Sequence, residues 1–336
     1  MSGKTAGGAK APPVAVGEMP TVGKFVNSVE GNVVYEVTRE IGSGTFGSVY
    51  QVQRKSDGKK MAMKCEHVSV KKQVLPLECH VLDQGNAIKS PHFCMIFDKG
   101  QCERFCFITM TLLGPNLWHL RKVRPHRTFS INTGLKVAEQ ALQGIRDLHR
   151  IGYLHRDIKP LNFAIGDDAD SHTVFIIDFG MGRQFKGAGK EIRKPRASAP
   201  FRGTTRYAAL AVHHSEEQSR RDDIESWLYM MIELITGSLP WKQFPATERA
   251  KIMASKEDSR DKLLPQLLEG CPFEAFSRIL GYLDQLSYKD IPDYDFVWKM
   301  IDVAAKQNGC SPADALDWDL GVPYRGPRYV PERTFN

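Results

Sequence analysis

Strand-forming side chains are concentrated in the first third of the chain, in short runs separated by glycine and charged residues. Runs of β-branched and aromatic residues of this length favour strands. The predicted strands cover residues 33–37, 49–53, 61–64 and 105–113. Gly114-Pro115 is expected to end the last strand. Between the strands, residues 75–82 predict the start of a helix, because Glu78 and Leu82 are four apart and share a helix face.

Helical periodicity dominates after residue 115. Val137, Ala141 and Ile145 recur at helical spacing and predict an amphipathic helix over residues 132–150. Residues 223–236 are apolar on nearly every face, which predicts a central buried helix. Further helices are predicted at residues 247–252, 273–286 and 296–305. Strands followed by helices are typical of an α+β fold, in which the helices are segregated from an antiparallel sheet.

The two ends of the chain differ from this pattern. Residues 1–33 are rich in Gly, Ala and Pro and lack periodicity, so they predict a flexible tail. Residues 321–336 contain proline and aromatic residues and predict a mobile or loosely docked end. The globular part is therefore expected to cover residues 34–320.

Composition narrows the class of protein. Hydrophobic residues make up 42% and charged residues 25% of the 336 residues, an ordinary globular balance. The net charge is +7, and residues 183–206 carry eight basic residues against one acid, Glu191. Seven cysteines without a C-x-x-C pair, and no secretory leader, favour a reduced intracellular protein, cytoplasmic or nuclear. No apolar run reaches about 18 residues, so no membrane partner is expected.

A glycine-rich turn separates the first two strands. Residues 42–49 read G-x-G-x-x-G-x-V, and glycine allows backbone N–H groups to approach phosphates without obstruction from Cβ. A Rossmann loop is the competing interpretation, but it requires a helix directly after the glycines. Residues 49–53 are instead predicted as a strand, which favours a phosphate-covering hairpin.

A second candidate for chemistry lies at residues 155–162, which read His-Arg-Asp-Ile-Lys-Pro-Leu-Asn. The loop places a carboxylate (Asp157), an ammonium group (Lys159) and an amide (Asn162) within six residues. Such a set can hold an acceptor hydroxyl, a phosphoryl group and a metal ion together. Read alone, the loop could also be a charged surface turn.

The order of the pieces resembles the signature set of the protein kinases. It consists of the glycine hairpin, the strand Lys64, the helix Glu78, His-Arg-Asp, and Asp-Phe-Gly beginning at Asp178, 21 residues after Asp157. This resemblance implies the bilobal kinase fold. The small lobe, residues 34–113, would be an antiparallel sheet with one helix, and the large lobe, residues 114–320, mostly helical.

The resemblance also implies a role for each matching residue. Asp157 would orient the acceptor hydroxyl and accept its proton, Lys159 would neutralise the γ-phosphate, and Thr204 would contact Asp157. Lys64 would bind the α- and β-phosphates of ATP and pair with Glu78. Asn162 and Asp178 would ligate Mg²⁺ through oxygen. The remaining residues expected around ATP are Ile41, Gly42, Gly44, Gly47, Val49, Ala62, Met110, Leu112 and Leu113.

Several stretches are similar to the casein kinase 1 group of serine/threonine kinases. These are residues 112–117 and 217–223, with residues 201–208 and Asp317-Trp318 closest to the tau-tubulin kinase branch. The sequence departs from the kinase or casein kinase 1 pattern in two ways. Residues 209–211 read Ala-Leu-Ala where Ala-Pro-Glu is usual, and Asp284 stands where its arginine partner is expected. Thr111 also replaces an acid that casein kinase 1 enzymes carry at the hinge.

The resemblance predicts transfer of the ATP γ-phosphate to serine or threonine of proteins by a constitutively active monomer. Five cations, Arg193, Lys194, Arg196, Arg202 and Arg206, form a hypothetical anion site for acidic or phosphorylated substrates. The alternative is a solvated basic loop. Nucleic-acid binding is not predicted, because aromatic residues are not interleaved with the basic ones. An inactive scaffold is the alternative function, although every named catalytic residue is present.

Overall fold

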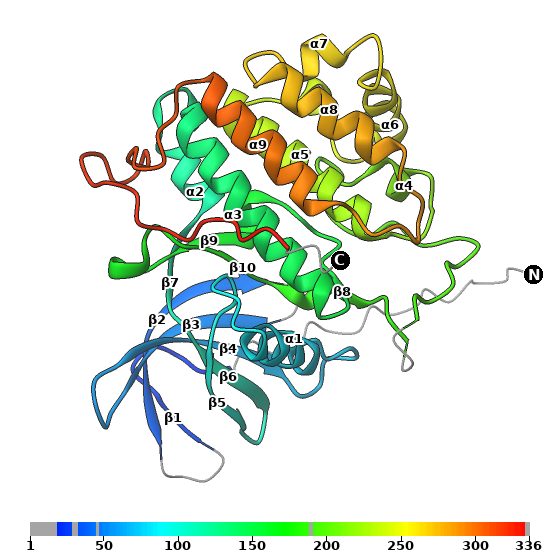
Figure 1. Ribbon diagram of the computed structural model, residues 1–336. Helices are drawn as coiled ribbons and strands as arrows, with labels where there is room; N and C mark the ends of the chain where they lie inside the picture. Colours follow the sequence, from blue (N-terminus) through cyan, green and yellow to red (C-terminus); the bar gives the residue numbers. More distant parts are fainter. Residues whose placement is uncertain (1–18, 29–32, 45–46, 188–190, 333–336) are drawn as a thin grey trace, which may run out of the picture. The chain divides into compact units, whose positions relative to one another are not determined.

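The computed structural model describes residues 19–28, 33–44, 47–187 and 191–332. The chain separates into two compact units. One contains the described residues up to Leu75 together with Phe97–Met110, and the other contains Pro76–Ile96 and the described residues from Thr111 onward. The first unit is a sheet and the second is mostly helical, which confirms the predicted α+β class (Figure 1).

The sheet unit is built from six strands in the order β1-β2-β3-β4-β6-β5. Its strands are β1 (Phe25–Asn27), β2 (Val34–Gly44), β3 (Gly47–Arg54), β4 (Lys60–His67), β5 (Ile96–Gln101) and β6 (Phe105–Met110). The pairs from β1 through β4 to β6 are antiparallel. One face carries the core, where Val37, Val52, Met61 and Phe107 are almost fully buried. Side chains alternate between the two faces of a strand, so the residues between these core positions lie on the opposite face of the sheet.

The helical unit surrounds the buried helix α5 (Arg220–Thr236). Its other helices are α1 (Leu75–Ala87), α2 (Leu117–Lys122), α3 (Ile131–Arg150), α4 (Leu210–His213), α6 (Arg249–Asp258), α7 (Leu264–Leu267), α8 (Phe273–Asp284) and α9 (Tyr294–Gln307). Helix α5 begins with a capping box between Ser219 and Asp222 and ends at Gly237, whose φ of 81° suits a C-terminal glycine. Trp227 and its neighbours are fully buried, as their apolar pattern predicted.

Two small sheets in the helical unit contain the strands on either side of the loop at residues 155–162, β8 before it and β9 after it. One has the order β10-β9-β7, formed by β7 (Leu113–Asn116), β9 (Phe163–Gly166) and β10 (Val174–Ile176). The other pairs β8 (Tyr153–Leu154) with β11 (Arg183–Gln184). The prediction that Gly114-Pro115 ends a strand is wrong, since both residues lie inside β7. Pro115 is tolerated there because β7 is an edge strand with an irregular register.

The predicted tail at residues 1–33 needs correction. Residues 25–27 form β1, which pairs with β2. Val26 is 4% exposed, and Met19 packs against the same core. The alternation in Phe25-Val26-Asn27 turns only the valine inward, which is sufficient for a short edge strand. Residues 1–18 and 29–32 of the predicted tail lie outside the described residues.

The predicted loose end at residues 321–336 is also wrong over its described part. Tyr329 is 5% exposed, stacks on the Trp298 indole at 5.3 Å, and donates a hydrogen bond to Asp295. Its backbone N–H donates to Glu139 of α3, and Arg146 of α3 donates to the carbonyl of Val330. These contacts attach the segment to α3 and α9 (Figure 1). They also satisfy the buried polar side chains of Glu139 and Arg146 on α3.

Smaller differences concern boundaries. The helix predicted at residues 247–252 is α6, which continues to Asp258, and α9 starts two residues before its predicted position and ends two residues after it. Helix α1, expected in the small lobe, belongs from Pro76 onward to the helical unit. Within the described ranges, no helix combines the length and apolar character needed to span a bilayer.

Candidate active site

Asp223, near the start of α5, binds the backbone of the loop at residues 155–162. Its carboxylate accepts hydrogen bonds from the backbone N–H of His155 at 2.8 Å and of Arg156 at 2.9 Å. Asp223 is 3% exposed and also accepts from His149 Nε2 at 2.9 Å. Burial alone would raise the pKa of Asp223, but the hydrogen bond from His149 lowers it overall. The anionic carboxylate thus fixes the loop, including Arg156 at its left-handed φ of 66°.

Asp157 is the centre of a short hydrogen-bonded chain. Thr204 Oγ1 donates to Asp157 Oδ1 at 2.7 Å, and Lys159 Nζ lies 2.5 Å from Asp157 Oδ2. Lys159 Nζ also donates to Thr204 Oγ1 at 3.3 Å. Asp157 is 7% exposed, so a few ordered donors dominate its surroundings. The structure therefore brings together three of the predicted catalytic residues.

Gly203 makes this approach possible. Its φ is 102°, and a Cβ at this position would lie 2.6 Å from the carbonyl oxygen of Arg156. Any other residue would push the segment that carries Thr204 away from Asp157.

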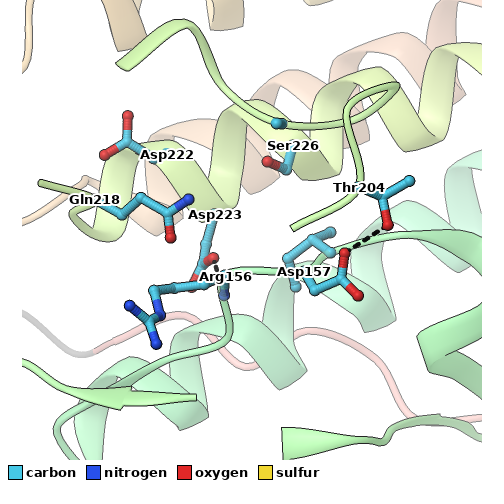
Figure 2. A pocket seen from close by; sticks show the side chains of 9 residues that line it. Arg156, Asp157, Thr204, Gln218, Asp222, Asp223 and Ser226 are labelled. Carbon is cyan, nitrogen blue, oxygen red and sulfur yellow. Dashed lines mark hydrogen bonds between the residues drawn. The ribbon is translucent and has the colours of Figure 1, made fainter. Parts of the chain in front are cut away.

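Asp157 is one of the residues that line a small pocket (Figure 2). Asp157 and Thr204 line it together with Gln218, Asp222 and Ser226, so α5 and the catalytic loop share its walls. Burial raises the pKa of Asp222 to about 7, in contrast to its neighbour Asp223. The lining residues and the hydrogen bonds of Asp223 together show that the start of α5 contacts this loop.

Asn162 and Asp178 provide oxygen atoms suited to a divalent cation. Asn162 Nδ2 donates to the backbone carbonyl of Asp157 at 2.8 Å, which leaves its Oδ1 as the available ligand atom. The backbone N–H of Ile177 donates to the carbonyl of Asn162 at 2.9 Å and so ties the two ligand-bearing segments together. Among the described residues, no group of three or more His, Cys, Asp or Glu could hold a metal ion. Two protein ligands fit Mg²⁺, which commonly takes its other ligands from phosphates and water.

Asp178 is placed by the residue that follows it. Asp178 has φ 64° and ψ 74°, a conformation that a non-glycine residue adopts only when its surroundings hold it. Phe179, 1% exposed, stacks on Phe93 with the ring planes 4° apart and packs against His155. His155 Nε2 lies 3.0 Å from the carbonyl of Ile177. The aromatic packing therefore fixes the backbone on both sides of Asp178.

Four of the residues predicted around ATP lie on the same face of the sheet. Val49 pairs with Lys64, and Ala62 pairs with Met110, so all four side chains lie on the face opposite the core. Gly47, at φ 138°, approaches the β4 backbone so closely that a Cβ would lie 2.0 Å from the carbonyl of Cys65.

The other two glycines of the hairpin, Gly42 and Gly44, would meet no atom of the described residues within 4 Å if they carried a Cβ. Packing against the described part of the chain therefore does not require glycine there, whereas close approach of a phosphate would. Ile41 lies on the same strand, β2.

The remaining predicted residues of this group lie in the helical unit. Glu78 is on α1 and is 3% exposed, and Leu113 starts β7 directly after Leu112. The unusual Thr111 has a local role. Its N–H donates to the carbonyl of Met95, and its hydroxyl accepts from the N–H of Met95, each at 3.0 Å.

The five predicted anion-site cations differ in their partners. Arg206 donates to Glu233 at 2.8 Å, and Arg196 pairs with Glu217. Arg193 donates to the Lys186 carbonyl at 3.3 Å and to Gln184. The other two, Lys194 and Arg202, are exposed. Arg196 and Arg206 therefore each have an acidic partner, and the anion site stays a prediction.

A different ion pair lies at the place of the one that the glutamate of Ala-Pro-Glu usually forms with an arginine. Glu225 of α5 accepts from the backbone N–H of Leu210 at 3.0 Å and pairs with Arg260 at 2.7 Å. Arg260 also lies 3.3 Å from Asp284, at the position where an arginine was expected. An acid and an arginine are thus still paired beneath the segment, although both come from different positions.

Sequence reasoning missed Asp223, Gly203 and Glu217 as supporting residues of the site. A signal existed for Gly203, because a glycine directly before a catalytic threonine suggests close backbone approach. Asp223 and Glu217 gave no comparable local signal, since their partners lie tens of residues away in the chain.

Comparison with known proteins assigns the fold to a family. The family described as protein kinase domain matches residues 35–276. Serine/threonine-protein kinase spe-6 of Caenorhabditis elegans is 36% identical over 304 residues, which cover 89% of this chain and 79% of the relative. A probable serine/threonine-protein kinase of Dictyostelium discoideum is 35% identical over 287 residues, 85% of this chain and 56% of the relative.

Proposed function

The chain belongs to the protein kinase family, and from this premise we propose a constitutively active serine/threonine kinase of the casein kinase 1 group that prefers acidic or phosphorylated protein substrates. That it is an ATP-dependent serine/threonine protein kinase follows from the family and the relatives. Contacts of the segment after Asp178 support constitutive activity and the substrate preference.

We assign the ATP- and metal-holding roles to the residues whose geometry fits them. Asn162 Oδ1 and the Asp178 carboxylate would hold Mg²⁺, while the hairpin of Gly42, Gly44 and Gly47 would cover the phosphates. When bound, ATP with its metal supplies the phosphoryl group. The protein then orients the acceptor hydroxyl through Asp157, which receives the hydroxyl proton at its carboxylate, and Lys159 adds positive charge beside it.

Constitutive activity is supported by the way in which Glu217 holds the segment. Arg156, which in many kinases clamps a phosphorylated residue, donates here from Nε to the carbonyl of Met181 at 2.9 Å. Glu217, 5% exposed, pairs with Arg183 at 3.2 Å and with Arg196. Its carboxylate thus lies between arginines, as a phosphate would. The segment is anchored by an acid that is part of the chain and needs no modification.

Constitutive activity predicts the same specific activity before and after phosphatase treatment of bacterially produced protein. Glu217→Ala is expected to lower activity at least about tenfold, because Arg183 and Arg196 then lose a contact of the charge-assisted class. A radiolabelled peptide assay measures both. Activity that appears only after phosphorylation, with Ser198, Thr204 and Thr205 as candidate sites, would contradict the proposal.

The substrate preference is supported by uncompensated positive charge beside Glu217. One carboxylate faces the guanidinium groups of Arg183 and Arg196, and the charge of Arg156 also acts on it. Arg193, Lys194 and Arg202 add exposed cations that show no acidic partner among the described residues. Arginine forks of this kind suit phosphate and carboxylate groups on a substrate.

The preference is tested with two peptides that differ only in a phosphoserine upstream of the acceptor. We expect the phosphorylated peptide to have the higher kcat/KM, and the triple variant R193E/K194E/R202E to reduce that advantage about tenfold, or about 1.4 kcal/mol. Lys299→Glu, an exposed cation on α9, is the matched control. Equal rates for both peptides with the wild-type enzyme would remove the preference.

We also propose a reducing intracellular location. The cysteines at positions 65, 94, 102, 106, 271 and 310 carry thiols that form no disulfide. Disulfides are rare in reducing compartments, so this state agrees with such a location.

A further inference from the structure

A lysine lies fully buried beneath the segment that carries Thr204. Lys256, on α6, has no exposed surface. Lysine is almost never fully buried unless its ammonium group is paired, because desolvation of the charge is costly. Burial lowers the pKa of Lys256 to about 7. A residue kept at such a cost needs an explanation, and the catalytic chain from Asp157 to Thr204 does not use it.

The contacts of Lys256 are directed at backbone oxygens of one turn. Its Nζ donates to the carbonyl of Thr205 at 3.0 Å and, through a short hydrogen bond, to the carbonyl of Ala208. A third neighbour is His213 Nε2 at 3.2 Å. The amine also lies over the rings of Tyr229 and Trp241, 5.1 Å from each ring centre. The aromatic faces and the carbonyls together replace the water that the group has lost.

The turn itself is continuous with the catalytic threonine. The backbone N–H groups of Tyr207 and Ala208 both donate to the carbonyl of Thr204 at 2.9 Å. Carbonyls of the residues that follow accept hydrogen bonds from side chains outside the turn. Lys256 binds those of Thr205 and Ala208, and Trp241 Nε1, in the 3₁₀ turn η5 (Pro240–Gln243), donates to that of Arg206 at 2.8 Å. Side chains from two distant segments thus satisfy three backbone acceptors of the turn, those of Thr205, Arg206 and Ala208.

The buried environment lets Lys256 hold the turn in either protonation state. Both an ammonium and a neutral amine have at least two N–H bonds for the two carbonyls. His213 Nε2 accepts a hydrogen bond from the ammonium and, when it carries a hydrogen, donates one to the neutral amine. Glu225 and Arg260 face the same region and act on the pKa of Lys256 in opposite directions.

We propose that Lys256 is a positioning residue for the acceptor substrate: it fixes the turn at residues 204–208, and thereby keeps Thr204 on Asp157 and shapes the surface beside the acceptor hydroxyl. Lys256 performs this function through the backbone and does not touch the reacting atoms. The proposal rests on the kinase activity alone and is independent of the preference for acidic or phosphorylated substrates.

The test compares Lys256→Met, which keeps the length and apolar stem but removes every donor, with the wild-type full-length chain. We expect the KM for an unphosphorylated acceptor peptide to rise about tenfold, the loss of roughly one to two hydrogen bonds. The KM for ATP and the rate of ATP hydrolysis without peptide should stay within about twofold, since the hydrogen bonds of Lys256 go to the acceptor side. Lys251→Met, an exposed lysine on the same helix, is the control and should change neither.

A role limited to stability would move all these constants together or lower only the melting temperature. Equal changes in the KM for peptide and for ATP, or an unchanged peptide KM, would overturn the proposal. If Lys256→Met does not fold, Trp241→Phe decides the question, because it removes the indole N–H that donates to the carbonyl of Arg206 and leaves a smaller aromatic ring at this buried position. It should raise the peptide KM about threefold without changing the KM for ATP, and an unchanged peptide KM would overturn the proposal.

Discussion

Replacing Asp157 by asparagine is expected to lower kcat for peptide phosphorylation about 10³-fold, the usual contribution of a positioned general base. Asparagine keeps the size of the side chain and an oxygen that can accept from Thr204, so the loop should keep its shape. It cannot receive the hydroxyl proton, and it removes the anionic partner of Lys159. The measurement is single-turnover transfer of labelled phosphate from ATP·Mg²⁺ to an acidic peptide.

The matched control is Asp167→Asn, an exposed carboxylate a few residues beyond Asn162. It should leave kcat unchanged. The melting temperature of Asp157→Asn should stay close to that of the wild type, because the loop is held mainly by Asp223 and not by Asp157. A variant that retained more than a tenth of the wild-type kcat would show that Asp157 is not the base.

The local parts of this site could be predicted from the sequence because their chemistry is contained in short segments. The loop from His155 to Asn162, and the alternation that places Val49 and Lys64 on one sheet face, depend on neighbours in the chain. Strands and buried helices follow from the same local periodicity. The positions of Asp157, Lys159 and Thr204 relative to one another then follow once the segments meet, and the structure brings them within hydrogen-bonding distance.

The supports of the site could not be predicted in this way. Lys256 reaches carbonyls 48 and 51 residues away, and backbone carbonyls leave no trace in the side-chain sequence. The docking of Tyr329 on α3 joins residues 190 apart, and its proline-containing surroundings are equally typical of a mobile end. The burial of Val26 was not predicted because its strand has only three residues, too few for the alternation of exposed and buried positions to be recognised.

Asp223→Ala is expected to be the most destabilising single change near the site. The substitution leaves three buried donors, the N–H groups of His155 and Arg156 and His149 Nε2, without their acceptor. Buried polar groups that lose their partner cost about 1–3 kcal/mol each, so we expect a loss of roughly 3 kcal/mol or more in the free energy of unfolding. Denaturant unfolding at neutral pH measures the loss, and kcat should fall with it because the loop carries Asp157.

The adjacent Asp222 provides a sharp control, since it is buried to the same degree and belongs to the same turn of α5. Burial raises the pKa of Asp222 to about 7, so a large fraction of its carboxyl groups is already protonated at neutral pH. Asp222→Asn should therefore lower the free energy of unfolding less than Asp223→Asn. Asp223 has a lowered pKa, which means that its contribution to stability is present above its unfolded pKa and is lost as the pH falls through the folded one. Asp223→Asn should therefore remove part of the acid sensitivity of unfolding, and Asp222→Asn should not. Equal losses of stability and kcat in the two asparagine variants would contradict a specific role of Asp223, because only Asp223 binds the backbone of the catalytic loop.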